Sequence, residues 1–206
     1  MKSFFIALMS IFFDVSTFGE DRKNYFCPQD LTEHYKNEIK DFQLDGVYIG
    51  AHYRDIHDSI EAYKYRSDRQ YIWKYVEILS KVVEKYVDKN NGNPVLVGVP
   101  MHWTRYMIRW FNHIDSLVSG LSKNISIPVK KPLYAFFTQR QSKLSKIKRM
   151  QNRDHAFWLK KWTTLPETVI LVDDIVSTGS TANTCAKILK EAWVKKVYGV
   201  FIASNQ

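Results

Sequence analysis

One stretch of the chain limits its fold more than any other: an apolar run that ends in two adjacent acids and a hydroxyl-rich loop. Residues 169–172 are Val-Ile-Leu-Val, Asp173 and Asp174 follow, and after two apolar residues comes Ser-Thr-Gly-Ser-Thr at 177–181. A short apolar run bounded by turn residues is typical of a strand buried in a parallel sheet. Ligands bind at the carboxyl edge of such sheets, where this loop is expected to lie.

The loop has the chemistry of a phosphate cradle. Backbone N–H groups at a helix N-terminus bind anions, and the hydroxyl groups nearby add hydrogen bonds. Gly179 permits a tight turn and a close approach to the ligand. Asp173 and Asp174 repel phosphate but accept hydrogen bonds from sugar hydroxyls. The stretch therefore predicts a site for a phosphorylated ribose, with the phosphate held by Ser177, Thr178, Gly179, Ser180 and Thr181.

A plainer interpretation of the same residues is structural: two acids end a strand, and Ser/Thr residues cap a helix. Adjacent acids combined with several hydroxyls exceed what capping requires, so we favour a ligand site. The stretch is not a Walker A loop, because no Gly-Lys-Ser/Thr follows at the required spacing. Gly179 stands alone, which also excludes the glycine-rich fingerprint of dinucleotide-binding folds.

Strands and helices are expected to alternate along the rest of the chain. Alternation of this kind predicts an α/β fold with a twisted, mostly parallel sheet flanked by helices. It would place two loops at the carboxyl edge, residues 100–105 and 173–181. The expected strands are 46–53, 95–100, 127–134, 168–172 and 196–203, and the expected helices are 55–65, 70–87, 104–121 and 181–193.

The length of 206 residues suits one domain with a modest appendage. We expect an N-terminal appendage over 1–45, partly helical, and the main domain over 46–206. The apolar stretch 4–13 resembles a short signal-peptide core, but no cleavage site follows and it is too short to span a bilayer. We favour an amphipathic helix packed on the domain. Only two cysteines occur, Cys27 and Cys185, which favours a reducing, cytoplasmic location.

The net charge of +9 favours anionic partners such as phosphates or nucleic acid, without choosing among them. Part of the excess is local, because residues 140–153 carry six basic side chains and no acid. This segment is either a solvated loop or a surface that contacts phosphate groups. Its basic residues are Arg140, Lys143, Lys146, Lys148, Arg149 and Arg153.

The stretch 169–181 resembles the signature of type I phosphoribosyltransferases. Further motifs in the same order are similar to the ComF-type branch of that family, over about residues 45–205. That branch is named for a bacterial competence protein. These motifs are Val99-Pro100-Met101-His102, Arg105, Arg109 to His113, Lys64-Tyr65, and Gln141, Leu144, Arg149, Asn152 and Ala156-Phe157 in and beyond the basic segment.

The resemblance implies a type I phosphoribosyltransferase fold and a role for each motif. Asp173 and Asp174 would bind the ribose 2′- and 3′-hydroxyls of phosphoribosyl pyrophosphate, and residues 177–181 its 5-phosphate. Arg105 would pair with the pyrophosphate, and Mg²⁺ would bridge ligand oxygens. The reaction would displace pyrophosphate from the anomeric carbon. The pyrophosphate turn would be Pro100, Met101 and His102, and the cover loop would contribute Gln141, Lys143 and Arg149.

The chain departs from that branch at its N-terminus, where members often have a four-cysteine zinc finger. Only Cys27 remains, and the other ligand positions would fall near Val15, Phe18 and Asp30. A structural zinc site needs four ligands, so no zinc is expected and no protein metal ligands are assigned. Cys185 is expected in the core. His102 and His113 are expected to be hydrogen-bonding scaffold residues rather than catalytic ones.

A second departure is Trp110 and Trp193, which stand where the branch has glycine. Trp193 lies at a helix end, a place that usually takes glycine in a left-handed conformation. Some bacteria translate the UGA codon as glycine and others as tryptophan. Our hypothesis is that both positions are glycine in the native protein; the alternative is two genuine tryptophans.

Three functions remain open from the sequence. The first is a transferase that uses phosphoribosyl pyrophosphate and an acceptor that no motif identifies. The second is a non-catalytic accessory factor in the uptake of single-stranded DNA, since the resemblance implies a link to transformation and the basic charge suits strand contact. The third is a regulator that senses phosphoribosyl pyrophosphate, which we rank last because such proteins usually lack a cover loop.

Overall fold

The structure is a computed structural model that describes residues 26–65, 70–88, 92–101, 112–135 and 157–206. Several predicted features lie outside these ranges. They are the N-terminal helix 4–13, His102, Arg105, Trp110, and the basic segment with Gln141, Lys143 and Arg149.

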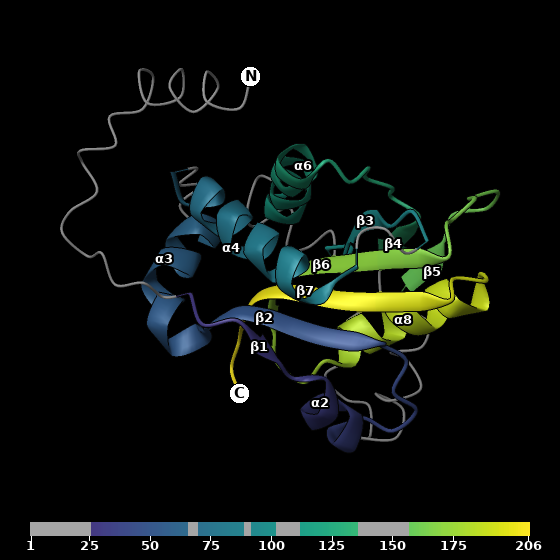
Figure 1. Cartoon of the computed structure of the whole chain (residues 1–206), viewed down its shortest axis with the longest axis horizontal. Coiled ribbons are helices and arrows are strands. Elements are labelled where there is room, and N and C mark those ends of the chain that lie inside the picture. The colour runs from purple at the N-terminus through teal and green to yellow at the C-terminus, as the bar shows by residue number, and fades with distance from the viewer. Residues whose placement is uncertain (1–25, 66–69, 89–91, 102–111, 136–156) are drawn as a thin grey trace, which may run out of the picture.

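A five-stranded sheet forms the centre of the described chain, in the order β1-β2-β7-β6-β3 (Figure 1). Strand β1 pairs antiparallel with β2, and every other pairing in the sheet is parallel. The predicted α/β class with a mostly parallel sheet is therefore confirmed. The strands are β1 (Gln29–Asp30), β2 (Gly46–His52), β3 (Val95–Gly98), β6 (Thr168–Val176) and β7 (Lys196–Ser204).

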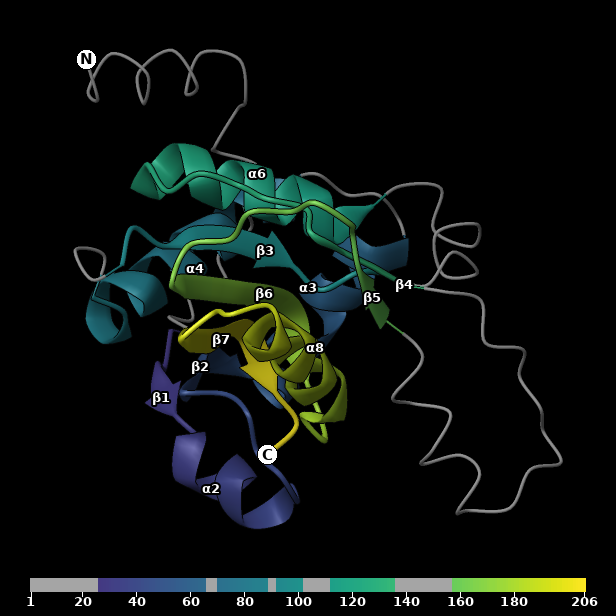
Figure 2. The ribbon, with the colours of Figure 1, turned by 90° about the vertical axis from the view of Figure 1, so that its right-hand side faces the viewer.

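Helices cover both faces of this sheet (Figures 1 and 2). One face is covered by α3 (Tyr53–Tyr65), α4 (Gln70–Tyr86) and α6 (His113–Ile125). The opposite face is covered by α2 (Thr32–Glu38) and α8 (Ser180–Glu191). This double cover explains why the central strands are apolar on both sides, since no face of the sheet is left to water.

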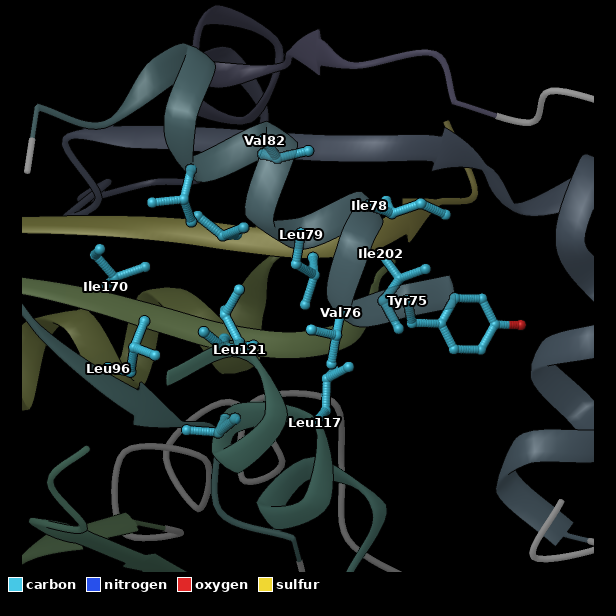
Figure 3. Packing of buried hydrophobic residues seen from close by; sticks show 14 of the residues in the cluster. Tyr75, Val76, Ile78, Leu79, Val82, Leu96, Leu117, Leu121, Ile170 and Ile202 are labelled. Carbon is cyan, nitrogen blue, oxygen red and sulfur yellow. The ribbon is translucent and has the colours of Figure 1, made fainter. Parts of the chain in front are cut away.

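The larger part of the core lies between the sheet and helices α4 and α6. Val76 and Leu79 of α4 meet Leu117 and Leu121 of α6 above Ile170 of β6 (Figure 3). The helical spacing of Tyr75, Val76, Ile78, Leu79, Val82 and Val83 puts these residues of α4 on this side, whereas Trp73 is exposed. On the other face, Cys185 of α8 is fully buried among apolar neighbours, as expected from the sequence.

The helix predicted over 104–121 lies partly outside the described residues, and its described part, 112–121, differs from the prediction at two points. Asn112 has an extended backbone, and its side chain accepts hydrogen bonds from the N–H groups of Ile114 and Asp115, so α6 begins at His113. The helix continues past Gly120 to Ile125. Gly120 does not end it, because this glycine lies where α6 packs closely on Val76 of α4, with no room for a larger residue.

The strand predicted over 127–134 is also mostly wrong. Pro128 lacks a backbone N–H, and the segment makes only an isolated bridge from Val129 to Leu96 before strand β4 (Leu133–Ala135). Strand β4 pairs antiparallel with β5 (Phe157–Leu159), which the sequence did not predict. Together they form a two-stranded ribbon beside α8, as Figure 2 shows.

The described part of the predicted appendage packs on the sheet. Strand β1 extends the sheet next to β2, and α2 buries Tyr35 in the core on the α8 side. Leu44 is buried in the same cluster. The division of the chain at residue 45 stays a prediction.

None of the helices in the described ranges has both the length and the apolar character needed to cross a membrane.

Candidate functional site

The predicted phosphate loop lies at the carboxyl edge of the sheet, between the end of β6 and the start of α8. Strand β3 ends beside the part of β6 that leads into Asp173, because the N–H of Val99 donates to the carbonyl of Val172 over 2.9 Å. Pro100 and Met101 follow directly and are half-buried. The two loops that the sequence assigned to this edge are thus neighbours in their described parts, while His102 and Arg105 lie outside the described residues.

Gly179 shapes the loop. It is the N-cap residue of α8 and has a left-handed backbone with φ of 67°. Within the described residues no side chain caps this helix by a hydrogen bond from the N-cap position. Ser177, Thr178 and Thr181 are exposed to solvent. Oγ1 of Thr178 accepts a long hydrogen bond of 3.5 Å from the N–H of Ser180. The exposed hydroxyls border a helix N-terminus that attracts anions.

The two acids project to different sides of the sheet, because neighbouring residues on a strand alternate in direction. Asp174 points toward α3 and α6, and its side chain is only 12% exposed. Asp173 is half-buried and lies near Cys185 of α8; burial and the charge of Asp173 together raise the pKa of that thiol. The pair therefore presents one fixed carboxylate and one more accessible carboxylate.

Asp174 forms a buried network with two side chains from separate helices. Its Oδ2 accepts a hydrogen bond from Nζ of Lys64 at 3.1 Å and lies 2.8 Å from Nε2 of His113. Its Oδ1 accepts from the N–H of Ile175 at 2.7 Å. Burial alone would raise the pKa of Asp174, but the hydrogen bond from His113 and the charge of Lys64 lower it well below its usual range.

Tyr63 completes this network from the side of α3. Its hydroxyl donates to the carbonyl of His113 at 2.6 Å, and its ring meets the imidazole edge-on. Burial and the charge of Asp174 raise the pKa of Tyr63, so it stays a neutral donor. His113 is thus a hydrogen-bonding scaffold residue, as expected from the sequence.

Sequence reasoning quoted Lys64 only as part of a resemblance and missed its contact with Asp174. A signal was present, because Ile56, Ile60 and Lys64 recur every four residues and share the buried face of α3. A lysine on a buried helix face requires an anionic partner.

No group of three or more His, Cys, Asp or Glu side chains that could hold a metal ion occurs in the described ranges. Mg²⁺ does not need such a group, because it keeps several waters and binds through one or two carboxylates plus ligand phosphates. The oxygen donors at this edge, Asp173 and the loop hydroxyls, suit that kind of ion. They do not suit zinc, which prefers cysteine and histidine.

No family model matches the chain. Competence protein ComFC of Streptococcus pneumoniae is 27% identical over 184 residues, which cover 83% of this chain and 77% of that protein. Competence protein F of Haemophilus influenzae is 34% identical over 50% of this chain and 46% of its own length. The chain is thus similar in sequence to ComF-type competence proteins.

A third ComF-type relative, ComFC of Bacillus subtilis, is 29% identical over 65% of this chain and 53% of its own length. The chain thus spans about half of two of these three proteins. Among solved structures, hypoxanthine phosphoribosyl transferase of Trypanosoma cruzi has a TM-score of 0.42 and 14% identity, covering 66% of this chain and 65% of that one. A glutamic acid mutant from an analysis of an invariant aspartic acid in HPRTs has the same TM-score and identity, covering 66% of this chain and 68% of that one. Likenesses of this size support no conclusion by themselves.

Proposed function

We propose that this chain is a phosphoribosyltransferase-family protein that binds phosphoribosyl pyrophosphate with Mg²⁺ and transfers the phosphoribosyl group to an acceptor. The observation that carries the proposal is one sheet edge with a left-handed glycine loop, exposed hydroxyls and two carboxylates directly before it. The loop suits the 5-phosphate, and the carboxylates suit the ribose diol.

The two acids have different tasks in this proposal. Asp173, half-buried at the edge, is the carboxylate that accepts hydrogen bonds from the ribose hydroxyls most directly. Asp174 contacts the sugar through its small exposed part while Lys64 and His113 hold it in place. A carboxylate kept ionised and fixed in direction needs little rearrangement when the ligand binds.

The reaction would form a bond from the acceptor's nucleophilic atom to the anomeric carbon while the bond to the pyrophosphate oxygen breaks. Pyrophosphate leaves with that electron pair. Mg²⁺ would neutralise charge on the departing group, and Asp173 with the loop hydroxyls would keep the sugar in line. The expected contributions of Pro100, Met101, His102, Arg105 and the cover-loop residues remain part of the proposal.

Thermal unfolding with and without phosphoribosyl pyrophosphate and Mg²⁺ tests this function. A ligand at about 100 times its Kd stabilises the native state by about 2.7 kcal/mol. We expect that gain in the wild type and its loss in Asp173→Asn/Thr178→Ala. Asp58→Asn, a change at a fully exposed carboxylate on α3, is the matched control and should keep the gain. No stabilisation of the wild type at millimolar ligand would contradict the proposal.

A second function is supported by a different surface: contact with single-stranded DNA as an accessory factor of uptake, the process with which competence relatives are associated. Tyr134 and Trp158 are directly paired across the β4–β5 ribbon, and both are exposed. Exposed lysines 160 and 161 follow them. Aromatic rings stack on bases, and lysines contact the strand backbone.

The two functions separate by their dependence on salt and metal. Binding of an oligothymidylate that depends on backbone contacts weakens steeply as salt rises, in proportion to the phosphates contacted. We expect Tyr134→Ala and Lys160→Ala/Lys161→Ala to weaken it, with no effect on stabilisation by phosphoribosyl pyrophosphate. If neither Tyr134→Ala nor Lys160→Ala/Lys161→Ala lowers the affinity for oligothymidylate, the proposal that DNA contacts this ribbon is wrong. Both functions are consistent with the proposed cytoplasmic location.

A further inference from the structure

Helix α2 lies directly beneath the phosphate loop, although it is about 140 residues away in sequence. Tyr35 of this helix is buried, and its hydroxyl donates to the backbone carbonyl of Ser177 at 2.9 Å. The same hydroxyl lies 3.1 Å from Oγ of Ser204, at the end of β7. One phenol thus joins the first residue of the loop to the neighbouring strand.

Side chains of α2 and of its C-cap residue Ile39 also pack against the loop at Gly179. A Cβ atom added to Gly179 would lie 2.9 Å from both Cδ1 of Ile39 and Cδ1 of Tyr35. These side chains therefore pack against the loop backbone at its turning point. The loop cannot sink toward α2 without displacing them, because packed interiors resist compression.

A second contact fixes the first turn of the helix that the loop opens. Oδ1 of Asn183 accepts from the N–H of Gln43 at 2.7 Å, and its Nδ2 donates to the carbonyl of Asp41 at 3.3 Å. The N–H of Asn183 itself donates to the carbonyl of Gly179 at 2.9 Å. Residues 41–43 therefore hold α8 one turn beyond the loop.

The segment that makes these contacts is anchored independently on the sheet. The N–H of Leu31 donates to the carbonyl of Val47 at 2.8 Å, and Oγ1 of Thr32 accepts from the N–H of Val47 at 2.9 Å. Strand β2 thus supports α2, and α2 supports the loop. We call residues 32–43 the α2 brace.

We propose that the α2 brace is a positioning element of the phosphate site, with Tyr35 as its main positioning residue. The proposal rests on the proposed function. A phosphate cradle works only when its N–H groups converge on one point, and displacements of about 1 Å at such sites cost large factors in activity. If Tyr35 only filled the core, its aromatic ring would be enough. Its hydroxyl has the additional role of donating a hydrogen bond to the carbonyl of Ser177 in the loop.

Amide hydrogen exchange in the unliganded protein tests the brace without any ligand. Tyr35→Phe keeps the ring and removes the bond to Ser177. We expect exchange in a peptide spanning 177–184 to accelerate about three- to tenfold, the range for one hydrogen bond. Tyr86→Phe is the matched control, because its hydroxyl also donates to a backbone carbonyl, that of Pro28 at 3.0 Å, away from the loop.

The same variants then report on ligand binding. Tyr35→Phe should weaken the affinity for phosphoribosyl pyrophosphate with Mg²⁺ about three- to tenfold, and Tyr86→Phe should leave it unchanged. Unchanged exchange at 177–184 in Tyr35→Phe, or equal acceleration in Tyr86→Phe, would overturn the brace. If Tyr35→Phe accelerates exchange throughout the sheet, Asn183→Ala replaces it, with the same expectation for 177–184. If the wild type does not bind phosphoribosyl pyrophosphate, the proposed function is wrong. The hydrogen exchange result still tests whether the α2 brace holds the loop, because it needs no ligand.

Discussion

At the scale of single residues, the buried ion pair between Lys64 and Asp174 is expected to contribute strongly to the stability of the fold. The side chains are 9% and 12% exposed, so neither charge can be left to water when its partner is removed. Desolvated charges without partners are among the most costly defects in a protein. The network therefore makes the position of Asp174 depend on α3 and α6 being correctly packed.

Lys64→Met should lower the free energy of unfolding by about 3–5 kcal/mol, because it leaves the Asp174 carboxylate without its cation. Lys131→Met is the matched control: Lys131 pairs with Asp115 at 2.8 Å, but its side chain is 58% exposed. Exposed pairs contribute about 0–1 kcal/mol, so this variant should differ little from the wild type. Urea unfolding measures both, and equal losses would contradict the buried network.

Asp174 also predicts how stability depends on pH. Its pKa in the folded chain lies below the value of about 3.9 in an unfolded chain. A depressed carboxyl pKa adds stability above the unfolded value, and that gain is lost as pH falls through the folded value. The stability difference between wild type and Asp174→Asn should therefore be largest near neutral pH and shrink below about pH 4. A difference that grows on acidification, in urea unfolding at several pH values, would contradict this assignment.

Trp193 occupies a backbone conformation that suits glycine, as the sequence led us to expect. Its φ is 70°, its N–H donates to the carbonyl of Lys190, and the N–H of Val194 donates to that of Leu189, the usual closure of a helix by a left-handed residue. The side chain is 91% exposed. Trp162 also has a positive φ of 60° and is fully exposed, which adds a third position to the glycine hypothesis.

Trp193→Gly should raise the free energy of unfolding by about 1 kcal/mol, since the left-handed conformation costs a residue with Cβ about 1–2 kcal/mol. Trp158→Gly is the control, because it removes an exposed tryptophan from an ordinary strand conformation and should destabilise instead. Thermal unfolding compares them. Intact mass of the protein from its native source checks the hypothesis: masses for tryptophan at 110, 162 and 193 would end it.

At the scale of elements, the sequence predicted what depends on local pattern. The mostly apolar residues 168–172 predicted the first part of β6, because apolar runs bounded by turn residues are typical of strands in parallel sheets. The strand continues through Asp173 and Asp174 to Val176, so the two acids lie within it and not after its end. The sequence did not predict β5, α2 or the start of α6 at His113. These depend on partners distant in sequence: β5 exists through pairing with β4, and α2 through packing on the loop and sheet. The buried position of Lys64 indicates that it needs an anionic partner, but the sequence does not identify Asp174 as that partner, because 110 residues separate them.

Gly179→Ala tests whether the loop and α2 act as one element. The substitution adds a Cβ that would meet Tyr35 and Ile39 at 2.9 Å, in a residue with positive φ. We expect a loss of about 1–3 kcal/mol in stability and loss of stabilisation by phosphoribosyl pyrophosphate. Gly120→Ala is the control, since its Cβ would meet Val76 at 2.7 Å in the α4–α6 contact, away from the loop. Gly120→Ala should still be stabilised by phosphoribosyl pyrophosphate. If both variants lose this stabilisation, the cause is a general folding defect and not the contact between the loop and α2.

At the scale of the whole molecule, the described residues before position 45 complete the sheet and its core. Strand β1 covers the edge of β2, and a bare edge strand invites pairing with other chains. Tyr35 and Leu44 are buried on the α8 side, and removing one buried aromatic side chain costs about 3–5 kcal/mol, a large part of a typical stability of about 5–15 kcal/mol.

A chain that starts at residue 46 should therefore unfold at much lower temperature than the full chain and aggregate through the exposed edge of β2. A chain that starts at residue 26 is the matched control, because it retains β1, α2 and their contacts, and it should unfold at a clearly higher temperature than the chain that starts at residue 46. Thermal unfolding and light scattering measure both. A fragment 46–206 as stable and monomeric as the longer chain would mean that β1 and α2 only cover a sheet that folds without them, and the α2 brace would then be dispensable for the fold but still testable at the loop.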